Sequence, residues 1–118
     1  MDLRIQKDCA NIDWNEVSQL MQSVNIGSHP PEIRQKAFAN SAAVVFIFAE
    51  EKLIGLGRAV SDCTYEAAIY DIAVHPEYQG KGIGKTIVET LMESLPTCSF
   101  ILYAAPGKEG FYAKLGFR

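Results

Sequence analysis

The chain has 118 residues, of which 48 % are hydrophobic and 21 % are charged, and its formal net charge is −3. This length predicts a single domain, residues 1–118, with enough apolar side chains to form a core. The lysines and arginines are scattered along an acidic chain, which argues against a nucleic-acid-binding surface and mildly favours a cationic substrate.

The cysteines and the first residues argue against disulfide-rich, metal-binding, secreted and membrane proteins. Cys9, Cys63 and Cys98 are odd in number and far apart, so we expect neither a disulfide framework nor a metal site. Residues 1–11 lack the apolar centre of a signal peptide, and the longest apolar run, 42–49, is too short to cross a bilayer. We therefore expect a cytoplasmic protein with reduced thiols and no membrane partner.

The first forty residues predict a strand and two helices. Leu3 and Ile5 alternate with charged neighbours, as in a short strand. Asp13, with Glu16 three residues later, is a capping-box pattern. A stripe of apolar residues at helical spacing follows it: Val17, Leu20, Met21 and Val24.

A breaker segment, 25–31, separates this helix from the next. His29 in this segment is expected to be exposed. The second helix is short and begins near Pro31, and its apolar positions are Ile33, Ala37 and Phe38.

The middle of the chain predicts an antiparallel meander. Residues 44–49 are uniformly apolar, as in a strand covered on both faces, and 53–60 returns as its hairpin partner. The next strand is 68–74, and the connections are too short for a crossover. Gly55 and Gly57 are expected to serve strand twist or a bulge rather than to leave room for a ligand.

The chain is organised around residues 70–85, YDIAVHPEYQGKGIGK. A strand that ends before Pro76 leads into glycines 80, 82 and 84, with Lys81 and Lys85 among them, and then into an amphipathic helix. The first N–H groups of a helix lack intrahelical partners, and glycines let an anion come close to them. This arrangement predicts a diphosphate cradle, with a plain strand-to-helix turn as the alternative.

Spacing distinguishes three kinds of phosphate loop. A P-loop needs a glycine where Gln79 stands, and the dinucleotide pattern G-x-G-x-x-G fails by one residue. The pattern [QR]-x-x-G-x-[GA] is matched by Gln79, Gly82 and Gly84. Together with FYAKLGF at 111–117, this stretch resembles the GCN5-related N-acetyltransferase family, and within it the small-amine branch that includes glucosamine-6-phosphate N-acetyltransferases.

The resemblance implies a mixed α/β sheet, an antiparallel meander whose fourth and fifth strands are parallel. The fifth strand is expected at 99–104, after a crossover helix, followed by a last helix that ends at Gly116. Family members usually continue past Phe117 into further strands. We therefore expect a truncated domain, or a homodimer that covers the exposed sheet edge.

The resemblance also implies a function. The chain is expected to be an N-acetyltransferase that moves an acetyl group from acetyl-CoA directly to a primary amine of a small molecule or peptide, without a metal. Two alternatives remain. One is a catalytically silent acyl-CoA-binding module, and the other is a nucleoside-triphosphate binder that uses Gly84, Lys85 and Thr86.

The residues carried over from the family fall into two groups. The main chain of Ile72, Ala73 and Val74 is expected to hold the pantetheine arm, with the Val74 amide at the thioester oxygen. The pyrophosphate is expected at the backbone N–H groups of Gln79, Gly80, Lys81, Gly82, Ile83, Gly84 and Lys85.

Two side chains are candidates for proton transfer. Tyr112 is expected to protonate the leaving thiolate, because a phenol with pKa ~10 stays protonated at rest. Asp71 is either a helper of amine deprotonation or a structural carboxylate that is hydrogen-bonded to nearby backbone, with Glu66 or water as other candidate bases. Where relatives carry a glutamate and an asparagine, this chain has Ala68 and Ala105, and His75 is expected at the surface.

Overall fold

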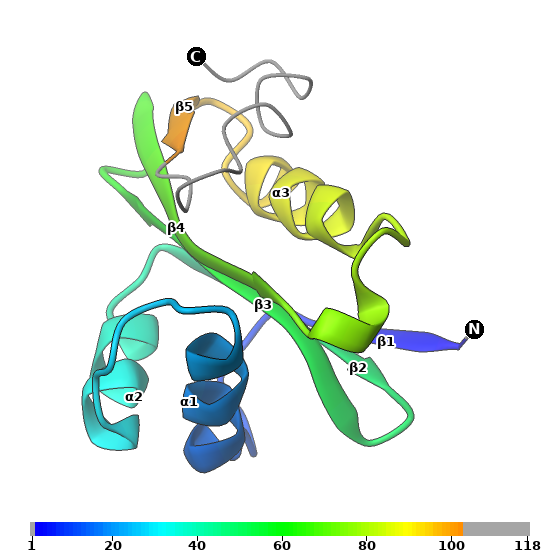
Figure 1. Ribbon diagram of the computed structural model, residues 1–118. Helices are drawn as coiled ribbons and strands as arrows, with labels where there is room; N and C mark the ends of the chain where they lie inside the picture. The colour runs from blue at the N-terminus through cyan, green and yellow to red at the C-terminus, as the bar shows by residue number, and fades with distance from the viewer. Residues whose placement is uncertain (1, 103–118) are drawn as a thin grey trace.

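The computed structural model describes residues 2–102, which form one five-stranded sheet and its covering helices (Figure 1). The strands are β1 (Leu3–Gln6), β2 (Ala43–Ala49), β3 (Lys52–Ser61), β4 (Glu66–Val74) and β5 (Ser99–Leu102). The helices are α1 (Trp14–Ser23), α2 (Pro31–Ala39), the 3₁₀ turn η1 (Pro76–Tyr78) and α3 (Ile83–Ser94). None of these helices is long and apolar enough to cross a membrane.

The strands lie in chain order, β1-β2-β3-β4-β5. Neighbours from β1 to β4 are antiparallel, whereas β4 and β5 are parallel because α3 carries the chain across between them. The predicted mixed sheet, including the parallel fourth and fifth strands, is confirmed. Of the predicted fifth strand, Ser99–Leu102 lies in the described part of the chain.

Two hydrophobic layers cover the sheet, with α3 on one face and α1 and α2 on the other (Figure 1). Alternate side chains of β2 lie in different layers. Val45 and Ile47 pack toward α3, whereas Val44 and Phe46 pack toward α1 and α2. All four are buried. The uniformly apolar run therefore marks a strand that is covered on both faces, as predicted.

The start of α1 confirms half of the predicted capping box. Asp13 accepts hydrogen bonds from the main-chain N–H groups of Asn15 and Glu16, at 3.0 and 3.3 Å. The Glu16 carboxylate does not complete the box, because it accepts instead from the Leu53 N–H at 3.0 Å. This contact ties α1 to the beginning of β3.

The buried face of α2 combines an apolar and a charged residue. Ile33 is 45 % exposed, whereas Arg34 is only 5 % exposed and Phe38 is buried. Phe38 packs against the rings of Trp14 and Phe46, with centroids 5.7 and 5.5 Å away. The helix is thus rotated so that an arginine, and not an isoleucine, faces the sheet.

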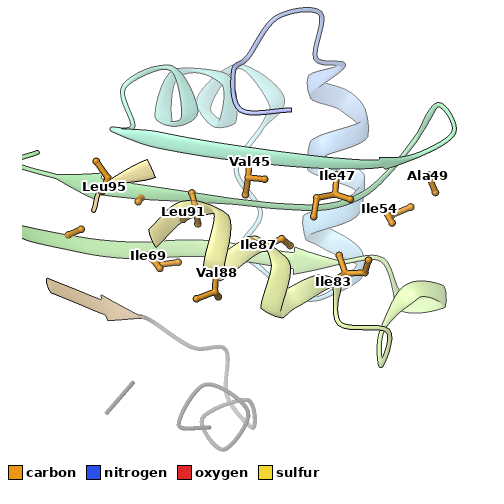
Figure 2. Packing of buried hydrophobic residues seen from close by; sticks show 12 residues of the cluster. Val45, Ile47, Ala49, Ile54, Ile69, Ile83, Ile87, Val88, Leu91 and Leu95 are labelled. Carbon is orange, nitrogen blue, oxygen red and sulfur yellow. The ribbon is translucent and has the colours of Figure 1, made fainter. Parts of the chain in front are cut away.

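Gly55 and Gly57 bring α3 close to the sheet, which the sequence did not predict. A Cβ at Gly55 would lie 2.9 Å from Ile83 Cγ2, and one at Gly57 would lie 2.7 Å from Ile87 Cγ2. Figure 2 shows Ile83 and Ile87 in this layer, between α3 and the strands. The expected bulge is also present, since the register of β3 against β4 shifts between Leu56 and Arg58.

Candidate functional site

The turn after β4 is held by its own side chains. β4 ends at Val74, before Pro76, as predicted. His75, which was expected at the surface, is partly exposed, and its Nδ1 accepts the Glu77 N–H at 3.1 Å. The Gln79 amide Nε2 donates to the Val74 carbonyl oxygen at 3.0 Å. The first residue of the [QR]-x-x-G-x-[GA] pattern therefore links the loop to the end of the strand.

Gly80 and Gly82 take backbone conformations that suit glycine. Their φ angles are +78° and +81°, and a Cβ at either position would meet no atom within 4 Å. Crowding therefore does not explain these two glycines. Instead they supply the positive φ that the turn needs, and they leave open space above the main chain.

The first turn of α3 opens into this space. Gly82 is the N-cap residue, and its carbonyl accepts both the main-chain N–H and the hydroxyl of Thr86, each at 3.1 Å. The N–H groups of residues 83–85 precede that first bond of the helix, so they form its positive end. Lys81 and Lys85 are exposed beside them. Open backbone, free amides and two cations fit a diphosphate.

The strand that leads to this turn carries a bulge. Leu56 pairs with Ala73 and Arg58 with Tyr70, so that two residues of β4, Asp71 and Ile72, lie opposite Gly57 alone. Asp71 has φ +61°, a conformation that aspartate tolerates better than most residues. After the bulge, side chains alternate again between the two layers of the domain: Ile72 and Val74 pack toward α3, and Ala73 toward α1 and α2.

The bulge also points Asp71 toward α2 and between two arginines. Its Oδ2 accepts from Arg58 Nε at 2.7 Å, and its Oδ1 lies 4.0 Å from Arg34 Nη1. Arg58 also donates to the Ser41 hydroxyl at 3.3 Å. Arg34, Arg58 and Asp71 form a half-buried group, here called the Asp71 cluster. A structural Asp71 was expected to be hydrogen-bonded to nearby backbone, whereas the partners of its carboxylate are guanidinium groups.

The two arginines of the Asp71 cluster were missed in the sequence analysis. Arg58 offered a signal, since a charge within the apolar strand 53–60 needs a partner, and the hairpin register places it close to Asp71. Arg34 offered no such signal in the sequence, because its contact with Asp71 joins α2 to β4, which are distant in the chain. Burial lowers the pKa of its guanidinium, Asp71 raises that pKa, and Arg58 lowers it.

The remaining predicted residues do not converge on the cradle in the described part of the chain. Glu66 is exposed at the start of β4, roughly 26 Å along the strand from Val74 at ~3.3 Å per residue. His29 is exposed, as expected. Tyr112 and Ala105 lie outside the described residues. Within 2–102, no three His, Cys, Asp or Glu side chains are grouped as metal ligands would be.

Comparison with known proteins identifies the family to which this fold belongs. The model of the "Acetyltransferase (GNAT) family" matches residues 11–117. The chain belongs to this family. A curated relative, "Uncharacterized N-acetyltransferase ycf52" of Pyropia yezoensis, is 35 % identical over 114 residues, which is 91 % of this chain and 66 % of that protein. The chain thus spans slightly less than two thirds of that relative.

Solved structures support the same fold. A Staphylococcus aureus protein named "Probable Acetyltransferase" superposes with a TM-score of 0.88 at 24 % identity, covering 99 % of this chain and 90 % of that one. Glucosamine-6-phosphate N-acetyltransferase from Arabidopsis thaliana superposes with a TM-score of 0.74 at 20 % identity, covering 100 % and 92 %. At these identities the likeness shows the GNAT fold and not a substrate.

Proposed function

We propose that the chain is an N-acetyltransferase that moves the acetyl group of acetyl-CoA directly to a primary amine. The observation that carries this proposal is the open glycine turn in front of α3, in a chain of the GNAT family. Gly80 and Gly82 hold the turn at positive φ. The amides of 79–85 would then bind the pyrophosphate, because anions are stabilised at helix N-termini.

Acetyl-CoA supplies an activated thioester, and the chain supplies its placement. We assign the pantetheine arm to the main chain of Ile72, Ala73 and Val74, directly after the bulge. The Val74 N–H is assigned to the thioester carbonyl, where a fixed donor stabilises the charge that develops during acyl transfer. Tyr112 is assigned to protonate the departing thiolate.

Asp71 is proposed to help remove the proton from the amine. An ionised carboxylate has about four lone-pair positions, and the hydrogen bond from Arg58 Nε uses one of them. Asp71 faces α2, so the proposal places the acceptor on the α1 and α2 side of the sheet. Water is the other candidate base, whereas Glu66 lies at the far end of β4.

The first experiment tests the cradle with a melting-temperature series in acetyl-CoA, CoA and ATP with magnesium. A ligand at 100 times its Kd raises the free energy of unfolding by about 2.7 kcal/mol. At about 0.25 kcal/mol/K for a chain of this size, that corresponds to roughly 11 °C. Stabilisation by ATP with magnesium but not by acetyl-CoA would contradict the proposal and favour a nucleotide binder.

The second experiment separates an enzyme from a silent module. Free-thiol release is followed with acetyl-CoA and a panel of polyamines, amino sugars and peptides with free amino termini. We expect turnover with at least one amine, and a loss of about 10²-fold in kcat for Tyr112→Phe, typical of a missing general acid. Acetyl-CoA binding without turnover would favour the silent acyl-CoA-binding module.

The panel also tests the narrower substrate proposals. Glucosamine 6-phosphate represents the amino-sugar branch that residues 70–85 and 111–117 resemble, and the peptides represent protein amino termini. We propose the broader class, a small or peptide amine, because the likeness to the glucosamine-6-phosphate enzyme is one of fold.

Two further proposals concern the assembly and location of the chain. A homodimer through the β5 edge is supported by the exposed Ile101, which lies beside the exposed Val60 on the surface between β3 and β5. Light scattering at increasing concentration tests it, and a monomer throughout would contradict it. A cytoplasmic location stays a prediction, tested by fractionation of the native host.

A further inference from the structure

The side chain of Arg34 joins two segments that are distant in sequence. From α2, its Nη2 donates to the carbonyl oxygen of Ile26, in the connection between α1 and α2. Its Nη1 lies 4.0 Å from the Asp71 carboxylate, at the bulge of β4. The side chain is only 5 % exposed, so both contacts are made largely away from water. One buried guanidinium therefore bridges the α1–α2 connection and β4.

The α1–α2 connection is shaped to receive this guanidinium. Gly27 has φ +64°, and a Cβ built there would lie 3.1 Å from Arg34 Nη2. A larger residue at this position would push the guanidinium away and would also strain the backbone. The glycine thus serves the arginine contact, and it offers a second way to disturb that contact without changing any charge.

Stability alone does not account for Arg34. Its Nε is buried without a hydrogen-bond partner, and a buried donor without a partner is unfavourable. Asp71 already has a closer ion-pair partner in Arg58, at 2.7 Å, so loss of Arg34 would not leave an unpaired carboxylate. Replacing a whole buried ion pair by well-packed apolar residues of similar volume is often neutral or stabilising, so a buried ion pair is weak evidence for a stabilising role.

We propose that Arg34 is a positioning residue, which holds the α1–α2 connection and Asp71 in a fixed relation so that the acceptor amine is presented to the bulge of β4. This inference rests on the proposed function, which places the acceptor on the α1 and α2 side. Arg34 touches neither substrate, and it acts through Asp71 and the main chain of Ile26.

The test compares Arg34→Met with Lys36→Met, an exposed cation of the same helix. Hydrogen exchange is followed in the described segment 24–30, together with the melting temperature, the Kd of acetyl-CoA, and KM and kcat for the best amine of the panel. In Arg34→Met we expect about tenfold faster exchange in this segment, as for a local opening. We expect its melting temperature to stay within about 4 °C of wild type, or about 1 kcal/mol.

The kinetic readout distinguishes positioning from a structural role. For Arg34→Met the KM of the amine should rise about tenfold while the Kd of acetyl-CoA changes less than about threefold, because the lost contact concerns acceptor binding. Lys36→Met should leave all five quantities unchanged. Arg34→Lys should recover part of the KM effect, because a lysine keeps the charge but cannot supply two donors in a fork.

Gly27→Ala is the independent variant, and it should accelerate exchange in 24–30 while Arg34 stays intact. Unchanged exchange in both variants, or faster exchange with an unchanged amine KM, would overturn the inference. So would a large fall in melting temperature with loss of protection throughout α2, which would mark a structural role. If wild type itself neither binds acetyl-CoA nor acetylates an amine, the proposed function fails, and the exchange data still show whether Arg34 holds the connection.

Discussion

Gly57→Ala tests the close packing of α3 on the sheet. The new Cβ would lie 2.7 Å from Ile87 Cγ2, with Leu91 Cδ1 at 3.4 Å and Ile72 Cγ1 at 3.6 Å. Carbon atoms normally approach to about 3.5–4.0 Å, so the Ile87 contact is too short by about 1 Å. Ile87 is fully buried in a helix, where a β-branched side chain has one strongly preferred rotamer. Its Cγ2 cannot turn away, and α3 must shift.

Two effects of opposite sign set the magnitude. Overpacking of a core costs about 1–3 kcal/mol, while replacing a glycine gains about 0.5–1 kcal/mol from the unfolded chain. The net loss is about 1–2 kcal/mol. With an entropy of unfolding of ~0.25 kcal/mol/K for 118 residues, we expect the melting temperature to fall by roughly 4–8 °C.

The assay is thermal unfolding, with a double-mutant cycle as its control. Ile87→Ala removes the atom that the new Cβ meets, so the double variant should be at least about 1 kcal/mol more stable than the sum of the two single effects. A Gly57→Ala protein that melts at or above the wild-type temperature, or strictly additive effects, would refute the short distance between α3 and β3.

Three further predictions concern the cradle, a helix cap and a thiol. Gly82→Ala should weaken acetyl-CoA binding about tenfold by calorimetry, because an alanine at positive φ costs roughly 1–2 kcal/mol, whereas Gly82→Asn should weaken it less; equal affinities would contradict this role. Asp13→Ala should lower the free energy of unfolding by about 1 kcal/mol and Asp13→Asn by less, as measured by urea titration; equal losses would exclude the cap. Burial, with a smaller effect of Asp8, raises the pKa of the Cys9 thiol above its ordinary 9.0. The pKa of this thiol is higher in the folded than in the unfolded protein. The contribution of the protonated thiol to the free energy of unfolding is therefore complete below the ordinary pKa and is lost as the pH rises through the folded-state pKa. Cys9→Ser should remove that alkaline loss in urea titrations up to about pH 10.5, and a loss that persists in the variant would belong to another group.

Most of the sheet could be predicted because local patterns determine it. The apolar run at 44–49, the return at 53–60 and the strand before Pro76 each contain their own boundary signals, and the observed strands agree with them within two residues at both ends. The glycine turn was also local, since the [QR]-x-x-G-x-[GA] pattern and the helix after it are contiguous. Gly80 and Gly82 then showed the positive φ that such a turn uses.

The errors concern contacts between distant segments. Ile33 is an apolar position of the predicted second helix, but Arg34 is the residue that is buried, because Asp71 lies across from it in the folded chain. Gly57 was attributed to the strand itself, whereas α3, which follows later in the sequence, limits the space above it. The predicted general acid, Tyr112, lies outside the described residues and stays a prediction.

The two faces of β2 have a consequence for how this fold can change. Val45 and Ile47 belong to one hydrophobic layer, Val44 and Phe46 to the other, and the described buried residues of the two layers do not overlap. Substitutions in the layer that packs against α1 and α2 can therefore accumulate while the side chains under α3 keep their packing. A lineage built on such a sheet is free to diversify one side by drift while the opposite side stays under purifying selection, and a randomised library confined to α1 and α2 would exploit the same independence.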